Sequence, residues 1–268
     1  MAIVKIDAYG LLKKIKEQKP VVHHLTNWVT IYDCANVVKV LGASPVMAHA
    51  PEEVAEMAGI ASSLVLNIGT LTVDFIEAMK IAAKSANRKN IPVILDVCGA
   101  GATKLRDQKC FELLDSAQIA IIKGNASEIA RIGGQTVKTK GVDAGNVTAN
   151  LSDLAAGLAK SRHCTVVITG QEDIVTDGKR CYSIKNGHPM MANIVGTGCM
   201  AASVVGTFAA VEADYVETSA AALVCFEIAS ELAVKKSHGP GTFKEQLFDA
   251  LFHLDKVTID DMQKVELW

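Results

Sequence analysis

Apolar positions follow two different spacings along most of the chain. Short β-branched runs at residues 63–68, 93–97, 119–123 and 166–169 alternate with longer segments in which apolar residues recur every three or four positions. The short runs are typical of buried parallel strands, and the longer segments are typical of amphipathic helices. The pattern therefore predicts an α/β fold in which helices cover both faces of a central, mostly parallel sheet.

Residue types at the ends of the longer segments predict where several helices begin and end. Asp7 is an expected N-cap before an apolar stripe over residues 8–15, and Gly42 suits the C-terminal cap of a helix over 31–41. Pro51 and the two glutamates after it predict a further helix start, because proline suits the first helical position and carboxylates favour the N-terminal dipole.

The last third of the chain predicts a different arrangement. The step Asp177-Gly178 separates two short apolar runs and predicts a β-hairpin. Three helices should follow, one after Gly198, one over about 218–236 and one over about 243–254. We find no internal repeat or linker, so we expect a single domain over residues 1–268.

Two further features of this last third predict which segments face solvent and whether any segment crosses a membrane. In the second of the three helices Glu227, Glu231 and Lys235 share one face, which predicts a solvated surface. Residues 190–211 carry no charged side chain, but Gly196 and Gly198 interrupt them, so we expect a strand, a tight turn and a buried helix rather than a membrane span.

Composition narrows the class of protein. Half of the 268 residues are hydrophobic (50%), and 27 Lys and Arg against 29 Asp and Glu leave a net charge of −2. No basic field is available to bind a phosphate backbone, so we expect no nucleic-acid partner and no membrane partner. Seven scattered cysteines without a CxxC pair, and an N-terminus without a signal-peptide pattern, favour a cytoplasmic protein with reduced thiols.

Gly196-Thr197-Gly198-Cys199, followed by an apolar run, is the sharpest local motif. A glycine turn that opens a helix leaves free N–H groups at the positive end of the helix dipole, which suits an anion. A thiol there should have a lowered pKa. The same residues also suit an ordinary turn into a packed helix, with Cys199 an inert core residue.

Other polar motifs follow the predicted strands. Asp96 ends one strand and precedes a glycine turn, which suits Mg²⁺ held through water. Lys123 ends the next strand; Asn125 and Glu128 after it have the spacing of a capping box, which alone would explain them. Thr169 follows a further strand. Because the carboxyl ends of parallel strands share one edge of the sheet, we expect these residues and the glycine motif to converge there.

In this order, the motifs resemble the hydroxyethylthiazole kinase family, which has the ribokinase-like fold. The similarity covers most of the chain and thins after about residue 240. The motifs that carry it are Thr26-Asn27, Val29-Thr30, Ala35-Asn36, Gly42-Ala43-Ser44-Pro45 with Met47, Pro51-Glu52-Glu53, Gly99-Ala100-Gly101-Ala102-Thr103, Gly124-Asn125-Ala126-Ser127-Glu128, Thr176-Asp177-Gly178, Asn186-Gly187-His188 and Gly196-Thr197-Gly198-Cys199.

The resemblance implies ATP- and Mg²⁺-dependent phosphorylation of the primary hydroxyl of 4-methyl-5-(2-hydroxyethyl)thiazole, in thiamine salvage, by a homotrimer whose substrate site lies between subunits. It implies the following roles: Gly196, Thr197, Gly198 and Cys199 in catalysis; Met47, Gly196 and Asn27 in substrate binding; Lys123, Thr169 and Asn125 in ATP binding; Asp96 and Glu128 at the metal. Cys199 would orient the substrate hydroxyl and assist late removal of its proton, in the place where related sugar kinases carry an aspartate.

The chain departs from the family pattern at a few positions. Lys123 stands where arginine is common, which exchanges a bidentate fork for a point charge. Cys98, His24 and Val195 are further departures, but none removes a carboxylate or a glycine that the mechanism needs. Three alternatives stay open: a kinase of another small alcohol such as a hydroxymethylpyrimidine, an ATP-dependent dehydratase of the same fold, and a thiazole-binding protein without turnover.

Overall fold

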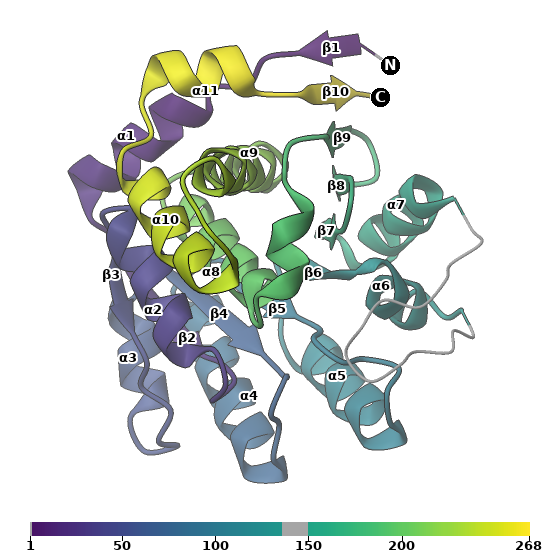
Figure 1. Cartoon of the computed structure of the whole chain (residues 1–268). Coiled ribbons are helices and arrows are strands. Elements are labelled where there is room, and N and C mark those ends of the chain that lie inside the picture. The colour runs from purple at the N-terminus through teal and green to yellow at the C-terminus, as the bar shows by residue number, and fades with distance from the viewer. Residues whose placement is uncertain (1, 136–149) are drawn as a thin grey trace.

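The structure is a computed structural model that describes residues 2–135 and 150–268. Within these residues a single sheet of ten strands runs through the molecule, in the order β1-β10-β9-β8-β7-β6-β5-β4-β2-β3 (Figure 1). The strands are β1 (Ala2–Val4), β2 (Val21–Leu25), β3 (Ser44–Val46), β4 (Ser63–Asn67), β5 (Val93–Asp96), β6 (Ile121–Asn125), β7 (Thr165–Thr169), β8 (Asp173–Thr176), β9 (Cys181–Ile184) and β10 (Val265–Leu267).

The sheet has a parallel part and an antiparallel part. Strands β2 to β7 are parallel to their neighbours, whereas β8, β9, β10 and β1 continue the sheet antiparallel. The expected hairpin is the β8–β9 pair, in which Thr176 lies opposite Cys181. Its loop is tightened by Asp177, whose carboxylate accepts the N–H groups of Lys179 and Arg180. The expected fold class, a mostly parallel ribokinase-like sheet with a small hairpin, is confirmed.

Helices cover both faces of this sheet, so the described residues form three layers (Figure 1). The helices are α1 (Ala8–Gln18), α2 (Ile31–Val40), α3 (Val54–Ile60), α4 (Val73–Arg88), α5 (Lys104–Ser116), α6 (Ala126–Ile132), α7 (Leu151–Arg162), the short 3₁₀ helix η1 (Pro189–Asn193), α8 (Thr197–Ala209), α9 (Tyr215–Val234), α10 (Pro240–Phe252) and α11 (Lys256–Met262).

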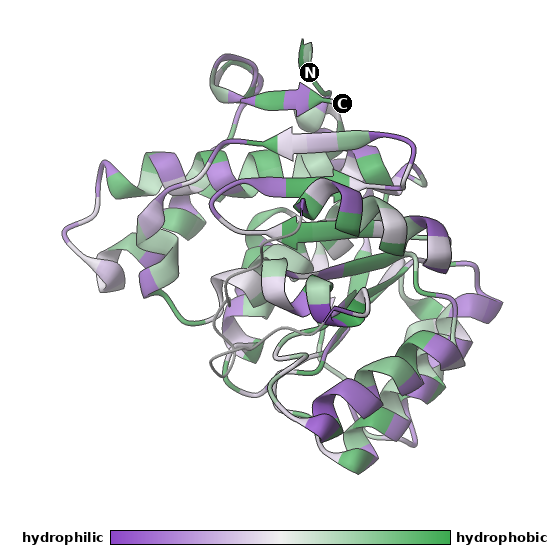
Figure 2. Ribbon diagram, turned by 90° about the vertical axis from the view of Figure 1, so that its right-hand side faces the viewer, coloured by the Kyte–Doolittle hydropathy of each residue, from purple (hydrophilic) through white to green (hydrophobic). Residues whose placement is uncertain are grey.

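Alternation along β4 shows how both faces are buried. The side chain of Val65 packs into the apolar cluster that contains Phe208 of α8, whereas Leu64 and Leu66 pack into the opposite cluster, which contains Met79 of α4. Apolar residues therefore concentrate along the strands and on the inner sides of the helices (Figure 2). This is why the strands read as uninterrupted apolar runs in the sequence.

Helix α8 lies unusually close to the sheet. A Cβ atom at Gly206 would come within 2.3 Å of the Val65 side chain on β4, so only glycine permits this approach. The close packing fixes the position of the first turn of α8 relative to the ends of β4 and β5. That turn carries the glycine motif, so its position bears directly on function.

Several details of the sequence-based expectations are wrong. Helix α3 begins at Val54, because the N–H groups of Glu53 and Val54 both bond to the Ala50 carbonyl and close a turn over residues 51–53. No strand precedes Gly196: the described chain forms η1 there, with His188 capping its start. A fourth C-terminal helix, α11, follows the three expected ones.

The expectation of a solvated face on α9 is also wrong for one residue. Glu227 is only 8% exposed, whereas Lys235 further along the helix is exposed. The cause is α9 itself, which is packed between the sheet and α10 and is buried over most of its length. The charge pattern of the helix could not show this burial.

The uncharged stretch of residues 190–211 does not form one long helix. Among the described residues, no helix is both long enough and apolar enough to cross a bilayer. All seven cysteines lie in the described part of the chain, and each is a free thiol there.

Candidate active site

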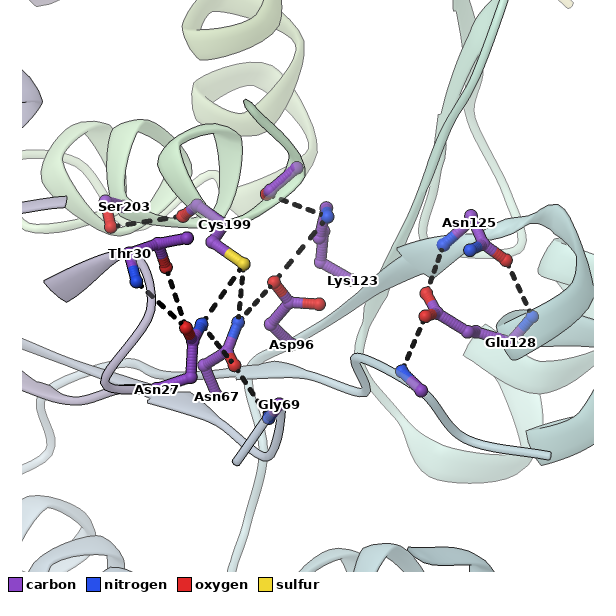
Figure 3. A network of polar contacts seen from close by, with 12 residues as sticks. Asn27, Thr30, Asn67, Gly69, Asp96, Lys123, Asn125, Glu128, Cys199 and Ser203 are labelled. Carbon is purple, nitrogen blue, oxygen red and sulfur yellow. Dashed lines mark hydrogen bonds and ion pairs between the residues drawn. The ribbon is translucent and has the colours of Figure 1, made fainter. Parts of the chain in front are cut away.

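The carboxyl ends of the parallel strands bring polar side chains together (Figure 3). Asn67 is the last residue of β4 and lies in register with Asp96, the last residue of β5; Asp96 in turn lies opposite Lys123 on β6. Asn27 follows the end of β2, the other neighbour of β4. The expected convergence on one edge is therefore present, although the glycine motif reaches it from η1 rather than from a strand.

Asn67 is at the centre of the hydrogen-bond network. Its Nδ2 donates to Asp96 Oδ2 at 2.8 Å and to Cys199 Sγ at 3.3 Å, and its Oδ1 accepts from Asn27 Nδ2 at 3.1 Å and from the Gly69 N–H at 2.9 Å. The side chain is 1% exposed. Asn67 therefore links the carboxylate, the thiol and the loop after β4 in fixed positions.

Asp96 and Lys123 form a buried ion pair. Lys123 Nζ lies 3.6 Å from Asp96 Oδ2 and donates to the carbonyl of Gly198 at 2.9 Å, so the pair lies against the first turn of α8. Burial would lower the pKa of Lys123, but the negative groups around it, Asp96 first, raise it overall. Burial raises the pKa of Asp96 well above its ordinary value, against the opposing attraction of Lys123.

The first turn of α8 is shaped by Gly196. Its φ of 94° lies in the left-handed region, and a Cβ there would come within 2.3 Å of Thr30 Cγ2, so glycine is required on both grounds. The hydroxyl of Thr197 donates to the Met191 carbonyl at 3.1 Å and fixes the turn. The first backbone N–H groups of a helix have no acceptor within it, so this turn can bind an anion.

Cys199 faces this network and is half-buried. Its sulfur accepts hydrogen bonds from Asn27 Nδ2 and Asn67 Nδ2, both at 3.3 Å. The pKa of the thiol is lowered to about 5, first by a hydrogen bond from Cys98, against burial, and then by the charge of Lys123 and by hydrogen bonds from Thr30 and Asn67. The lowered pKa agrees with the expectation from the sequence, and the sulfur lies among polar side chains rather than in the apolar core. A catalytic role for Cys199 stays a prediction.

Glu128 holds two loops together. Its Oε1 accepts the N–H of Gly99 and its Oε2 accepts the N–H of Asn125, each at 2.7 Å, while Asn125 Oδ1 accepts the Glu128 N–H at 3.0 Å. The capping box expected from the sequence is therefore present. In Figure 3 Glu128 lies beyond Asp96, toward α6, and its carboxylate faces the loop after β5.

The polar groups here fit a hydrated divalent cation better than a protein-only metal centre. Asp96 Oδ1 is buried and has no hydrogen-bond partner among the described residues, so one acceptor remains open. No group of three or more metal-ligating side chains occurs in the described part of the chain. Magnesium suits such a site, because it retains several waters and takes one or two carboxylates together with substrate phosphates.

The remaining predicted site residues lie at the same edge of the sheet. Met47 directly follows β3, Thr169 ends β7, and Asn125 ends β6. Asn125 Oδ1 already caps α6 and accepts from Ser127 Oγ at 2.8 Å. Met47 is half-buried, and its carbonyl bonds His49 Nδ1 at 3.2 Å. Their assigned ligand roles stay predictions.

Three residues of the site were missed by sequence reasoning: Asn67, Thr30 and Arg106. Asn67 could have been found as a polar residue at the end of an apolar strand, in the same position as Asp96. Thr30 donates to Asn27 Oδ1 at 3.1 Å. Arg106 donates to the carbonyls of Ile68, Gly69 and Cys98, at 2.7–3.1 Å, and nothing in its local sequence marks that role.

A mostly parallel sheet covered by helices on both faces, with polar side chains gathered at its carboxyl edge, is the arrangement of the ribokinase-like fold. Solved structures that share only the fold agree: a ribokinase-like superfamily protein of Enterococcus faecalis is 16% identical with a TM-score of 0.61, covering 88% of each chain. A pyridoxal kinase of Staphylococcus aureus, solved with AMP-PCP and pyridoxal, is 13% identical with a TM-score of 0.61, covering 93% of this chain and 98% of that one.

Closer relatives identify the family. The model of the hydroxyethylthiazole kinase family matches residues 12–257. A hydroxyethylthiazole kinase of Methanosarcina mazei is 53% identical over 95% of this chain and 98% of its own length. The solved hydroxyethylthiazole kinase of Pyrococcus horikoshii is 36% identical with a TM-score of 0.89, covering 98% of this chain and 99% of that one. This chain belongs to the hydroxyethylthiazole kinase family.

Proposed function

We propose that this chain transfers the γ-phosphoryl group of ATP to the primary hydroxyl of 4-methyl-5-(2-hydroxyethyl)thiazole, a step of thiamine salvage. Membership of the family makes the chain a phosphotransferase with an alcohol acceptor. The observation that carries the proposal is the convergence of Cys199, Asp96 and Lys123 at the first turn of α8. Phosphoryl transfer needs mainly this: positioning, and stabilisation of developing negative charge.

The first turn of α8 stabilises the phosphoryl group. Backbone N–H groups of Gly196, Thr197, Gly198 and Cys199 point at charge that develops on the phosphoryl oxygens during transfer. Lys123 adds a positive charge that is already held in place by the Gly198 carbonyl and Asp96. The arrangement is built before ligands arrive, so little reorganisation is needed at the moment of reaction.

Cys199 orients the acceptor. Two side-chain amides donate to its sulfur, which favours the thiolate, and a thiolate can accept a hydrogen bond from the substrate hydroxyl. A thiolate with a pKa of about 5 is a weak base. It therefore aligns the hydroxyl oxygen early and takes the proton only when the bond to phosphorus is well advanced.

The remaining roles follow the position of each residue. Asp96 and Glu128 would hold Mg²⁺ through water, and the cation would neutralise charge on the phosphates. Lys123, Thr169 and Asn125 would bind ATP. Met47, Asn27 and Gly196 would bind the thiazole, as the resemblance to the family implies. Asn27 already meets Cys199 directly.

We also propose a homotrimer in which the thiazole site lies between subunits. Four large apolar side chains next to the site are exposed in the single chain: Trp28 at 50%, Val29 at 67%, Tyr32 at 76% and Val195 at 74%. An exposed apolar patch of this kind is typical of an interface. We place the enzyme in the cytoplasm, from the cysteine usage, as one domain over residues 1–268.

A coupled assay of ADP release tests the proposed function. With the thiazole alcohol, ATP and Mg²⁺ we expect saturable turnover, and kcat/KM should exceed that for a hydroxymethylpyrimidine, because specificity lies in that ratio. Saturable binding of the thiazole without ADP release would instead indicate a binding protein. A higher kcat/KM for the pyrimidine would overturn the assigned substrate.

A further inference from the structure

A second polar region borders the first turn of α8. A cavity of about 780 Å³ is lined by Thr197 and Gly198 of that turn, by Thr169 at the end of β7, and by Asp173 and Glu227 of β8 and α9. The thiazole-side residues Asn27 and Asn67 do not line it. The cavity therefore extends from the phosphate-binding turn in a different direction from the acceptor site.

Asp173 lines this cavity and has one buried carboxyl oxygen without a donor among the described residues. The side chain is 2% exposed; Oδ1 accepts the N–H of Gly170 at 2.9 Å, and Oδ2 has no hydrogen-bond partner among the described residues. A buried carboxylate oxygen without a partner is costly. Burial accordingly raises the pKa of Asp173 to about 7.

Glu227 is the second acidic group of the cavity. Within the described chain no hydrogen bond reaches its carboxyl group, although the residue is only 8% exposed. Its Oε2 would lie 2.5 Å from a Cβ on Gly187, so the absence of a side chain at position 187 makes room for it. Burial, and then the negative charges of Asp173 and Glu231, raise its pKa well above the ordinary value.

Nearby charged groups do not balance this pair. Glu231, one turn further along α9, accepts from Asn186 and Lys264. Lys185 lines the cavity but forms an ion pair with Glu266. Asp173 Oδ2 and the Glu227 carboxyl group are therefore left without a donor from the described residues, at the lining of the cavity.

A ligand in the cavity can supply the donors that these carboxyl groups lack. Under the proposed function the phosphates of ATP lie at the first turn of α8, so the cavity is open to the rest of that molecule. A nucleoside carries two sugar hydroxyl groups and, in adenosine, an amino group on the base. These are donors that carboxyl oxygens bind well.

We propose that Asp173 and Glu227 bind donor groups of the nucleoside and thereby determine which nucleotide this kinase uses. The inference rests on the proposed function, since it needs a nucleotide at α8. It adds two specificity-determining residues to the phosphate-binding ones, and it explains two buried carboxyl groups that the phosphoryl-transfer mechanism does not use.

Nucleotide analogues that each lack one donor group provide the test. ATP, 2′-deoxy-ATP, 3′-deoxy-ATP and purine riboside triphosphate, which lacks the amino group, are compared with the wild type, Glu227→Leu and Asp173→Asn. Loss of one hydrogen bond to a carboxyl group of the cavity should cost about threefold to tenfold in kcat/KM for the nucleotide. In the wild type we expect at least one analogue to have a lower kcat/KM than ATP. In the variant that lacks the carboxyl group bound by the missing donor, ATP and that analogue should have similar kcat/KM values.

A binding measurement without the alcohol separates this inference from the proposed function. ATP should raise the Tm of the wild type, and the rise should be smaller in Glu227→Leu, since ligand stabilisation follows affinity. Without nucleotide the variant should be at least as stable as the wild type, because a buried unpaired carboxyl group is removed. Glu245→Gln removes an exposed charge on the neighbouring α10 and should behave as the wild type.

The outcomes are distinct. If ATP raises the Tm but no ADP forms with the thiazole alcohol, the assigned acceptor fails and the nucleotide site stands. If all four nucleotides are used equally by the wild type, or if each analogue keeps the same disadvantage in both variants, Asp173 and Glu227 do not bind the nucleoside. A Tm of Glu227→Leu well below that of the wild type would show that the carboxyl group serves the fold instead.

Discussion

The buried carboxyl groups near α8 fall into two regions that differ in their partners. Asp96 is surrounded by Lys123 and the Asn67 amide, which in turn connect it to Gly198 and Cys199. Asp173 and Glu227 share a cavity in which no described donor reaches Asp173 Oδ2 or the Glu227 carboxyl group. The first region holds a buried cation, Lys123, beside its carboxylate, as suits a site that must hold a phosphoryl group in place. The second has acceptors left over, as suits a site completed by its ligand.

The largest expected effect on kcat comes from removing the charge of Asp96, the carboxylate paired with Lys123. Asp96→Asn should lower kcat by about a thousandfold, because it removes a ligand of the proposed cation and leaves Lys123 buried without its counter-charge. The coupled ADP assay at saturating substrates measures this. Asp115→Asn removes a surface partner of Arg162 and serves as the control. More than a tenth of wild-type turnover in Asp96→Asn would contradict the proposed role.

The free energy of unfolding should depend on pH through Asp173, in the second region. The folded pKa of Asp173 is raised to about 7 from an ordinary 3.8, so the folded chain retains a proton that the unfolded chain releases. Its contribution to the free energy of unfolding is full below pH 4, falls as the pH rises toward 7 and stays constant above that. Asp173→Asn cannot lose this proton, so its stability should gain on the wild type by up to about 4 kcal/mol across that range.

Urea unfolding at pH 5 and pH 8 measures this difference. The free energy of unfolding of the variant minus that of the wild type should be larger at pH 8 than at pH 5. Curves that stay parallel between the two pH values would show that Asp173 does not carry the raised pKa.

Removal of the thiol that faces the acceptor should lower kcat less than removal of Asp96. Cys199→Ala should lower kcat by about a hundredfold, the range that one positioned proton acceptor contributes. Cys199→Asp should retain activity, since a carboxylate can accept the same hydroxyl proton. Cys164 directly precedes β7, at the opposite edge of the sheet, so Cys164→Ala is the matched control. Full turnover of Cys199→Ala at saturating thiazole alcohol would exclude the role.

The smallest effect concerns the reactivity of that thiol. With a pKa of about 5, Cys199 is a thiolate at neutral pH, so its alkylation by iodoacetamide should already be near its maximal rate at pH 6.5. Cys98→Ala removes the first cause of the lowering and returns the pKa of Cys199 toward that of an ordinary thiol. Its alkylation at pH 6.5 should therefore be slower by about tenfold and should still rise with pH above that value. Rates at successive pH values, followed by mass spectrometry, measure both. A rate that still climbs tenfold per unit up to pH 8.5 in the wild type would contradict the low pKa.

Most of the fold could be predicted because its signal is local. Runs such as residues 63–68 are apolar on both faces, and only strands of a covered sheet need that. The short strands β1, β3 and β10 carry too few residues for any pattern, and η1 replaced an expected strand because the dense apolar composition of residues 190–195 does not distinguish the two. Short apolar runs are ambiguous in this way.

The site could be predicted where a motif is contiguous and not where it depends on packing. The glycine motif and the Asn125–Glu128 capping box are each readable within four residues. Asn67 and Arg106 act on groups up to 132 and 38 positions away, and Glu227 is buried by α9 packing that its own charge pattern does not reveal. The groups that we propose to react could therefore be predicted from the sequence, but the groups that hold them in place could not.

Arg106 is one of these supporting residues, and it joins two loops at the edge of the sheet. A single planar guanidinium bonds to the carbonyls of Ile68 and Gly69, after β4, and of Cys98, after β5. The distance between the loop that borders the thiol and the loop that borders the carboxylate is thus set by a rigid spacer of fixed width. A flexible lysine at this position could not bond to all three carbonyls with one planar group, so the spacing of the two loops would vary from one molecule to the next.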